Sequence, residues 1–438
     1  MKKKSLFFTL FALLATFVAH AQNQLPVSPC FHDELITAQS HQTPDFRNAV
    51  DRAYEEALRK SKSVQTRDFK IYTIPVVFHV VHKNDTINLS DQRIKDQLQV
   101  LNETFRRRNS DTANTRSIFK SVAADAGIEF RLDRIIRVKT TASFKPNLLS
   151  QTDQIPNQVK KTAQGGSDAI DPDKYLNIWI CKIEPFELLT IQLGQILGFA
   201  YPPTGLSNWP QGASAPSKEL EGVVVDYRTV GKAGLLYDYP GREALKLQGR
   251  TMVHEVGHYL GLRHIWGDGS TFGASCNGED GVADTPKASS QSSFDCDQTK
   301  NSCKDDGATD LPDMIENFMD YSAESCQNMF TLGQVGLMRS VLEGVRKSLV
   351  EKISGIEEEK ATFAAHIAPN PSKGSVFFDW HENQPYELKI SDAYGRLIQK
   401  MNNSGSQNVD LSAHSSGLYL FEIRSNNRFQ VMKVVLTQ

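Results

Sequence analysis

Residues 254–264 read HEVGHYLGLRH, and this string constrains the chain more than any other feature of its sequence. Because an α-helix turns about 100° per residue, His254 and His258 project from one helix face and can bind the same metal ion. Gly261 can adopt the positive φ that ends a helix and turns the chain, so that His264 approaches as a third ligand. Three imidazoles leave one position of a tetrahedral Zn²⁺ for water, the arrangement of catalytic zinc sites.

Glu255 follows the first of these ligands directly, and its carboxylate is placed to act as a general base toward the attacking water. Bound Zn²⁺ would lower the pKa of that water toward about 7 and polarise a carbonyl group. The alternative is that the three histidines merely pack or face solvent. With 11 His in 438 residues, the full HExxHxxGxxH pattern is far more specific than a bare HExxH, and it favours the zinc site.

The amino terminus, MKKKSLFFTLFALLATFVAHAQ, has the parts of a secretory signal. Three lysines precede an apolar run, and the small residues Ala19 and Ala21 mark a cleavage site. We therefore expect residues 1–21 to be a signal peptide. This run, like every later segment, is shorter than the roughly 18 to 20 apolar residues of a membrane span, so we expect no transmembrane segment.

Charge gives no indication of nucleic acid as a partner. The net charge is −2 and the chain has no dense basic stripe, whereas nucleic-acid-binding proteins carry a basic patch. Beyond the three lysines of the expected signal, residues 106–108, three arginines, are the only tight cationic run, and they are typical of the solvated end of a helix.

Six cysteines in an exported chain predict disulfides. Four of them cluster within 51 residues after the HExxHxxGxxH string of residues 254–264, here called the zinc string, and allow three pairings: Cys276, Cys296, Cys303 and Cys326. Cys181 lies in the apolar run YLNIWICKI, which predicts a buried, unreactive thiol. Cys30 stands alone near the start of the mature chain.

Apolar periodicity ahead of the zinc string predicts strands that alternate with helices. We expect Ser90 to cap an amphipathic helix over residues 90–109. Runs dense in β-branched residues predict strands at 71–82, 128–135, 175–183 and 221–230. This order predicts an α/β sheet lobe beside the helix that carries His254 and His258, here called the zinc helix.

Residues 266–325 are rich in Gly, Asp, Ser and Cys and show little periodicity. Such a long irregular segment needs staples, and disulfides supply some of them. The stretch DGVADTP adds Asp280, Asp284 and Thr285, whose hard oxygen atoms are the kind that Ca²⁺ prefers. An Asx-rich turn is the open alternative.

Composition divides the rest of the chain. Residues 22–67 hold one helical pattern, over 44–62, and end in a charged stretch typical of a detachable prosegment. A helix capped by Thr331 closes the domain that we expect over 68–350. Residues 351–362 are charged and lack aromatics, so they read as a linker. Residues 363–438 alternate apolar and polar positions between turns, which predicts a small all-β sandwich domain without a catalytic constellation.

The zinc string in its context, GRTMVHEVGHYLGLRHIWGD, together with ENFMDYS, resembles the pappalysin family of metzincin metallopeptidases, particularly its cytophagalysin-like branch. The resemblance covers about residues 68–350 and includes YTIPVVFHVVH, LNETFRRRNSD, YLNIWI, ILGFA and GVVVDYR in the expected order. It implies an α/β (α+β) zinc peptidase domain with a twisted mixed sheet above a horizontal cleft and an irregular lower lobe below.

The resemblance also implies roles for single residues. Met319 would lie in the turn beneath the zinc site, and the Tyr321 hydroxyl would stabilise the oxyanion. Calcium would bind near Asp280 and Thr285. The cysteines would pair as Cys276 with Cys303 and Cys296 with Cys326.

Two further expectations combine the resemblance with chemistry. Relatives carry an acidic residue at the place of Glu324, in the pocket for the side chain just after the scissile bond, which would favour Arg or Lys there; an exposed loop acid is the alternative. Relatives also carry a prosegment cysteine at the distance of Cys30, whose thiolate would be the fourth zinc ligand of a latent form. Phe31 follows where they have Gly. A surface thiol and a lipid anchor stay open for Cys30.

The C-terminal unit resembles the sorting domains of type IX secretion substrates, through PNPSKG, DAYGRLI and GLYLFEI. The outer-membrane secretion machinery would then be a partner, and the protein would be secreted or attached to the cell surface after export through the periplasm. The favoured function is a secreted zinc endopeptidase acting on proteins or peptides. The alternatives are a surface adhesion module with a non-catalytic zinc site and a zinc amidase or exopeptidase.

Overall fold

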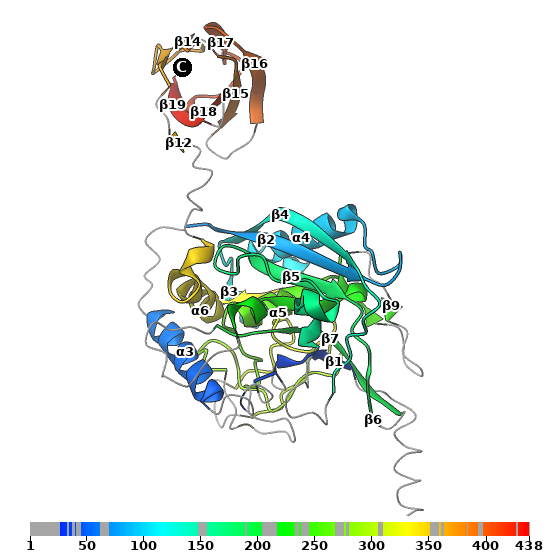
Figure 1. Cartoon of the computed structure of the whole chain (residues 1–438). Coiled ribbons are helices and arrows are strands. Elements are labelled where there is room, and N and C mark those ends of the chain that lie inside the picture. The colour runs from blue at the N-terminus through cyan, green and yellow to red at the C-terminus, as the bar shows by residue number, and fades with distance from the viewer. Residues whose placement is uncertain are drawn as a thin grey trace, which may run out of the picture. The chain divides into compact units, whose positions relative to one another are not determined.

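The structure is a computed structural model that falls into two compact units, Met1–Glu351 and Lys352–Gln438 (Figure 1). It describes residues 27–32, 35–36, 40, 45–61, 70–147, 156–188, 191–203, 217–232, 236–237, 245–267, 276, 280–304, 310–350, 359–360, 363–382, 384–392, 397–425 and 428–437. The expected signal peptide lies outside the described residues. No helix within these ranges is long and apolar enough to cross a membrane.

The first unit is built around a mixed sheet with the order β1-β7-β8-β5-β2-β4, and β6 pairs with β7. Strands β2, β4, β5 and β8 run parallel, whereas β7 is antiparallel to β8 and β1 is parallel to β7. The bounds are β1 Val27–Cys30, β2 Tyr72–His82, β4 Ile128–Lys139, β5 Leu176–Cys181, β6 Phe186–Leu188, β7 Ile191–Ala200 and β8 Val223–Asp226. The twisted mixed sheet predicted for this unit is confirmed.

Both faces of this sheet are covered, as expected for parallel strands with continuous apolar runs. Along β5, Ile178 and Ile180 belong to one apolar cluster, which includes residues of the helices α4 (Asp91–Phe105) and α5 (Arg250–Tyr259). Trp179 and Cys181 point the other way and belong to a second cluster. That second cluster also includes residues of the segment between β1 and β2: Phe31, Leu35, Ile36, Phe46, Val50 and Tyr54.

The helices are α3 Phe46–Ser61, α4 Asp91–Phe105, α5 Arg250–Tyr259 and α6 Leu332–Glu343. Ser90 caps α4 by accepting from Arg93 N, and Thr331 caps α6 within a capping box. Helix α4 ends at Phe105, earlier than the pattern predicted. Arg106 is buried and pairs with Asp125 and Glu129, so the prediction of a solvated arginine is wrong at this position: the two carboxylates compensate its burial.

The segment between α5 and α6 forms an irregular lobe held by covalent and polar links. The two disulfides join Cys276 to Cys303 and Cys296 to Cys326, with Cα separations of 5.6 and 5.9 Å. The pairing implied by the resemblance is thereby confirmed. Small two-stranded sheets add to this unit: β3 Ala123–Ala124 with β11 Phe330–Thr331, and β9 Leu236–Tyr237 with β10 Leu245–Lys246.

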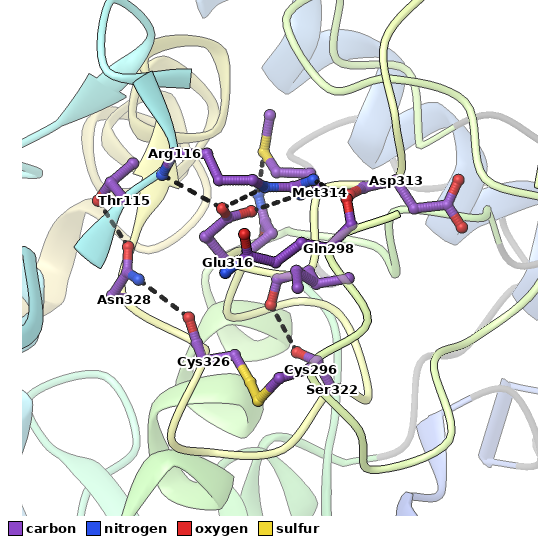
Figure 2. A network of polar contacts seen from close by, with 12 residues as sticks. Thr115, Arg116, Cys296, Gln298, Asp313, Met314, Glu316, Ser322, Cys326 and Asn328 are labelled. Carbon is purple, nitrogen blue, oxygen red and sulfur yellow. Dashed lines mark hydrogen bonds and ion pairs between the residues drawn. A yellow bond between two sulfur atoms is a disulfide. The ribbon is translucent and has the colours of Figure 1, made fainter. Parts of the chain in front are cut away.

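A largely buried ion pair ties this lobe to the segment after α4 (Figure 2). Arg116 binds Glu316 in a bidentate manner, with Nε to Oε1 at 2.6 Å and Nη2 to Oε2 at 2.8 Å. The same guanidinium donates to the carbonyls of Gln298 and Asp313, and Thr115 Oγ1 donates to Asn328 Oδ1. Since Glu316 lies three residues before Met319, these contacts fix the chain where it approaches the zinc helix.

In the described part of the second unit, all the elements are strands. They are β12 Glu359–Lys360, β13 Ala365–Ala368, β14 Ser375–Trp380, β15 Tyr386–Asp392, β16 Leu397–Asn403, β17 Gln407–Asp410, β18 Gly417–Ser425 and β19 Arg428–Leu436. A five-stranded sheet with the order β12-β19-β18-β15-β16 and a three-stranded sheet with the order β13-β14-β17 enclose one apolar core. The predicted all-β unit is confirmed.

Candidate metal centre

The zinc helix α5 is short and begins without a cap from its own N-cap residue, Gly249. Glu324, 73 positions after Thr251, replaces that cap: its Oε1 accepts from Thr251 N at 2.8 Å, and its Oε2 accepts from Arg250 N at 3.2 Å. A carboxylate at this place is also attracted by the positive end of the helix dipole, which stabilises the helix. At the other end, Gly261 has φ +93°, a conformation that side chains disfavour, and the chain turns toward His264.

The three imidazoles of the zinc string converge in a buried cluster. His258 Nε2 lies 3.0 Å from His254 Nε2 and 3.1 Å from His264 Nε2. Cys30 Sγ completes the set, whose four ligand atoms all lie within 4.8 Å of one another. In a tetrahedral zinc site with Zn–N near 2.0–2.1 Å, neighbouring ligand nitrogens would be about 3.3 Å apart.

The hydrogen bonds of the Nδ1 atoms of His254 and His258 decide which kind of ligand or ion the cluster can hold. His254 Nδ1 donates to Phe318 O at 2.7 Å, and His258 Nδ1 donates to Leu262 O at 2.8 Å. Each neutral ring has one N–H, so the two Nε2 atoms are lone-pair acceptors that face each other and cannot hydrogen-bond. Burial and the adjacent histidines also lower the pKa of His258 well below its usual value. These residues fit a cation with the coordination of Zn²⁺.

Glu255 lies against this cluster with its carboxylate fully buried. Its Oε2 accepts from the thiol of Cys30 at 3.4 Å. The carboxylate packs on the bare backbone of β7, where a Cβ at Gly198 would lie 2.9 Å from Oε1 and collide with it. Burial raises the pKa of Glu255 well above its usual value, and the Cys30 thiol opposes this change. A carboxyl group with a raised pKa can both accept and return a proton.

Met319 and Tyr321 approach the cluster from the irregular lobe. Met319 packs so closely on the zinc helix that a Cβ at Gly257 would lie 2.5 Å from its sulfur atom. The Tyr321 ring lies 5.5 Å from that of His254 and 5.1 Å from that of His264. The Tyr321 hydroxyl donates to the carbonyl of Cys30 at 3.1 Å, so it points to where a backbone carbonyl enters the site.

One residue of the site was missed by the sequence analysis. His32 is fully buried, and its ring stacks on that of His258 with centroids 4.0 Å apart and an interplanar angle of 4°. The only local signal was its position two residues after Cys30, which does not distinguish it from any other histidine. Its role depends on β1 pairing with the edge of β7, a long-range contact.

Glu324 lines a cavity of about 520 Å³ that also reaches His254 and Tyr321. The carboxylate is buried, which raises its pKa, whereas its bonds to the start of α5 lower it. Glu324 is therefore not the exposed loop acid that was the alternative. Its hydrogen bonds to Gln248, Arg250 and Thr251 give it a structural role that the sequence did not predict.

The three candidate calcium ligands make hydrogen bonds within the protein. Asp280 Oδ1 accepts from Val282 N at 2.9 Å and from the Thr285 hydroxyl at 2.8 Å, which is an Asx turn. Asp284 makes different contacts: it accepts hydrogen bonds from Thr331 Oγ1 and from Gly333 N at the start of α6. Calcium at Asp280, Asp284 and Thr285 stays a prediction.

Known proteins are similar to this chain in fold and in sequence. The family described as Pregnancy-associated plasma protein-A, the M43 peptidases, matches residues 232–343. The chain is 30% identical to an extracellular metalloprotease of Coccidioides posadasii over 309 residues, which are 70% of this chain and 88% of that protein. Mature mirolysin of Tannerella forsythia in complex with a cleaved peptide is 35% identical, with a TM-score of 0.52, over 64% of this chain and 96% of that one. A promirolysin mutant is 33% identical with a TM-score of 0.57, over 73% and 96%.

Fold, histidine cluster and buried glutamate together define a metallopeptidase of the metzincin type. The chain belongs to the pappalysin family, the M43 peptidases, as the resemblance implied. Residues 366–437 match the secretion system C-terminal sorting domain, so the protein is secreted or lies at the cell surface.

Proposed function

We propose that this metallopeptidase is a zinc-dependent endopeptidase that is made as a latent precursor. The observation that carries the proposal is the convergence of three histidine nitrogens with the Cys30 sulfur in one cluster, beside which the buried Glu255 carboxylate accepts from the Cys30 thiol. His254, His258 and His264 would hold the metal. When bound, Zn²⁺ would polarise the peptide carbonyl and acidify a water molecule.

The residues around the metal would perform the proton transfers. Glu255 would take a proton from the attacking water and pass it to the leaving amine, a general acid–base role that contributes about 10²–10⁴-fold to the rate. Tyr321 would donate to the oxygen on which negative charge develops. The hydrogen bond that the Tyr321 hydroxyl now donates to the Cys30 carbonyl supports this role as a donor. An extended substrate would pair with the edge of β7 where β1 now lies.

The same contacts support latency. Cys30 Sγ is near the three histidine nitrogens, and its strand occupies the edge of β7, so it would exclude both the water and the substrate. We divide the precursor into a signal peptide at 1–21, a prosegment at 22–67, the peptidase domain at 68–350, a linker at 351–362 and the sorting domain at 363–438. Cleavage near Arg67 would release the site.

Specificity and calcium are narrower parts of the proposal. Glu324 in the cavity beside His254 would favour Arg or Lys immediately after the scissile bond, because a partly desolvated carboxylate binds a cation by charge-assisted hydrogen bonds. Ca²⁺ at Asp280 and Thr285 would replace the hydrogen bonds of the present turn and stiffen the irregular lobe.

Hydrolysis of casein by the processed full-length chain, with the cut sites mapped by mass spectrometry, tests the function. Internal cuts followed by basic residues are expected, with one zinc per chain and loss of activity on chelation. Release of terminal residues only would support an exopeptidase. Zinc binding without any hydrolysis would support the adhesion module and contradict the proposal.

A further inference from the structure

Helix α3 of the prosegment docks on the peptidase domain through one continuous apolar stripe. Its buried positions recur every three or four residues, the spacing of a single helix face: Phe46, Ala49, Val50, Ala53, Tyr54 and Ala57. The helix lies beside α6 (Figure 1), where the Ser340 hydroxyl donates to Ala57 O at 2.8 Å. A segment that only carried Cys30 to the metal would not need this second interface.

The polar centre of the interface is Arg263, the residue before the zinc ligand His264. Its guanidinium forms an ion pair with Asp51, and its Cζ lies 4.1 Å from the centre of the Tyr54 ring. Arg263 is thus held from two sides by one helix, through charge and through a cation–π contact.

The same helix is connected to the zinc site by a second route. The Tyr54 hydroxyl lies 3.4 Å from His32 Nε2, and His32 stacks on the ligand His258. Tyr54 therefore contacts both Arg263, which is next to His264 in the sequence, and His32, which stacks on His258. None of these contacts uses the thiol of Cys30.

We propose that residues 46–61 form a second latch of the prosegment, and that the surface around Arg263 is its docking site for an amphipathic helix with an acidic residue. The inference rests on the proposed removal of the prosegment. Because the two attachments lie on one chain, each raises the effective concentration of the other, so loss of the cysteine alone leaves the prosegment bound.

The test uses the full-length, zinc-loaded chain with Glu255→Gln, which cannot cleave itself. An added trypsin-like protease cuts it between residues 61 and 70, and native mass spectrometry measures dissociation of the prosegment. We expect Cys30→Ser to leave the prosegment bound at micromolar concentration. Tyr54→Ala should weaken binding about 100-fold, as loss of a buried aromatic anchor does, and Asp51→Lys about fivefold or more.

Two matched variants make the result specific. Glu55→Lys makes the same charge change on the exposed face of α3 and should alter binding less than twofold. Asp51→Lys combined with Arg263→Glu should recover part of the binding that Asp51→Lys alone loses, because the ion pair re-forms with reversed charges although the cation–π contact with Tyr54 is lost. Zinc content is measured to show that His264 still binds. Release by Cys30→Ser alone, or equal effects of Asp51→Lys and Glu55→Lys, would overturn the second latch. Binding is measured without catalysis, so failure of the latch is distinguishable from failure of the proposed peptidase activity.

Discussion

The thiol of Cys30 donates a hydrogen bond to the carboxylate of Glu255, Sγ to Oε2 at 3.4 Å, across 225 residues of sequence. One residue near the amino terminus thereby reaches both the three histidines that could hold the metal and the proposed general base. A prosegment that binds there would block the site in two ways at once, since it fills a ligand position and covers the group that moves the proton.

Replacement of Glu255 tests the general base. Glu255→Ala should lower kcat by about 10² or more, because general-base transfer contributes about 10²–10⁴-fold. The variant should still fold and keep its zinc content, since the three histidines are retained. Peptide hydrolysis by the processed enzyme is the measurement, and near-normal turnover would refute the assigned role.

Replacement of Cys30 tests latency. Cys30→Ala in a chain whose Arg67 is also changed to Ala, to hinder processing, should hydrolyse a small peptide faster than the Arg67→Ala parent. The reason is that the fourth ligand position becomes available to water and residues 27–30 are no longer held by the metal. Because helix α3 still holds the rest of the prosegment, the activity should stay below that of the processed enzyme. If the two unprocessed proteins are equally inactive, the cysteine does not act as the switch.

Tyr321→Phe removes the hydroxyl that now donates to Cys30 O. Loss of one donor to a developing oxyanion costs about 10²–10³-fold in kcat, so we expect a decrease in that range with little change in KM. Steady-state kinetics separate the two parameters. An increase in KM alone would indicate substrate binding instead.

Glu324→Gln separates the two roles of this carboxylate. The amide loses the charge at the start of α5 and turns an N–H₂ group toward backbone donors, so the free energy of unfolding should fall by about 1–3 kcal/mol. Preference for Arg or Lys after the cut should fall as well, because the carboxylate no longer attracts a cation. Chemical denaturation and cut-site mapping measure the two effects. Loss of stability with unchanged specificity would leave only the capping role.

His79 should make stability depend on pH. It is buried between Ser167 and Asn177, and burial lowers its pKa from 6.5 to about 4. Between these values the unfolded chain binds a proton that the folded chain does not, so the free energy of unfolding falls as the pH falls. The loss from pH 7.5 to 4.5 should be about 2–3 kcal/mol. Urea unfolding should show this component in the parent and lose it in His79→Gln, which keeps polar groups but does not titrate. An identical pH slope in both proteins would contradict it.

The sequence by itself determined the parts of this protein that depend on local spacing. Helical periodicity places His254 and His258 on one face, and Gly261 permits the turn toward His264, because these relations follow from backbone geometry within a few residues. The strand patterns and the all-β unit follow from the same kind of periodicity. The disulfide pairs and the positions of Met319 and Tyr321 came from resemblance instead, since spacing alone left three pairings open.

Only the tertiary structure decided the contacts that join distant segments. The cap of α5 by Glu324, the close approach of Glu255 to Gly198 and the stacking of His32 on His258 have no local signal. Arg106 was misjudged for the same reason, because its partner Glu129 lies 23 residues later. Such pairs form when packed elements bring side chains together, and that packing depends on the apolar surface buried by the whole domain rather than on any one segment.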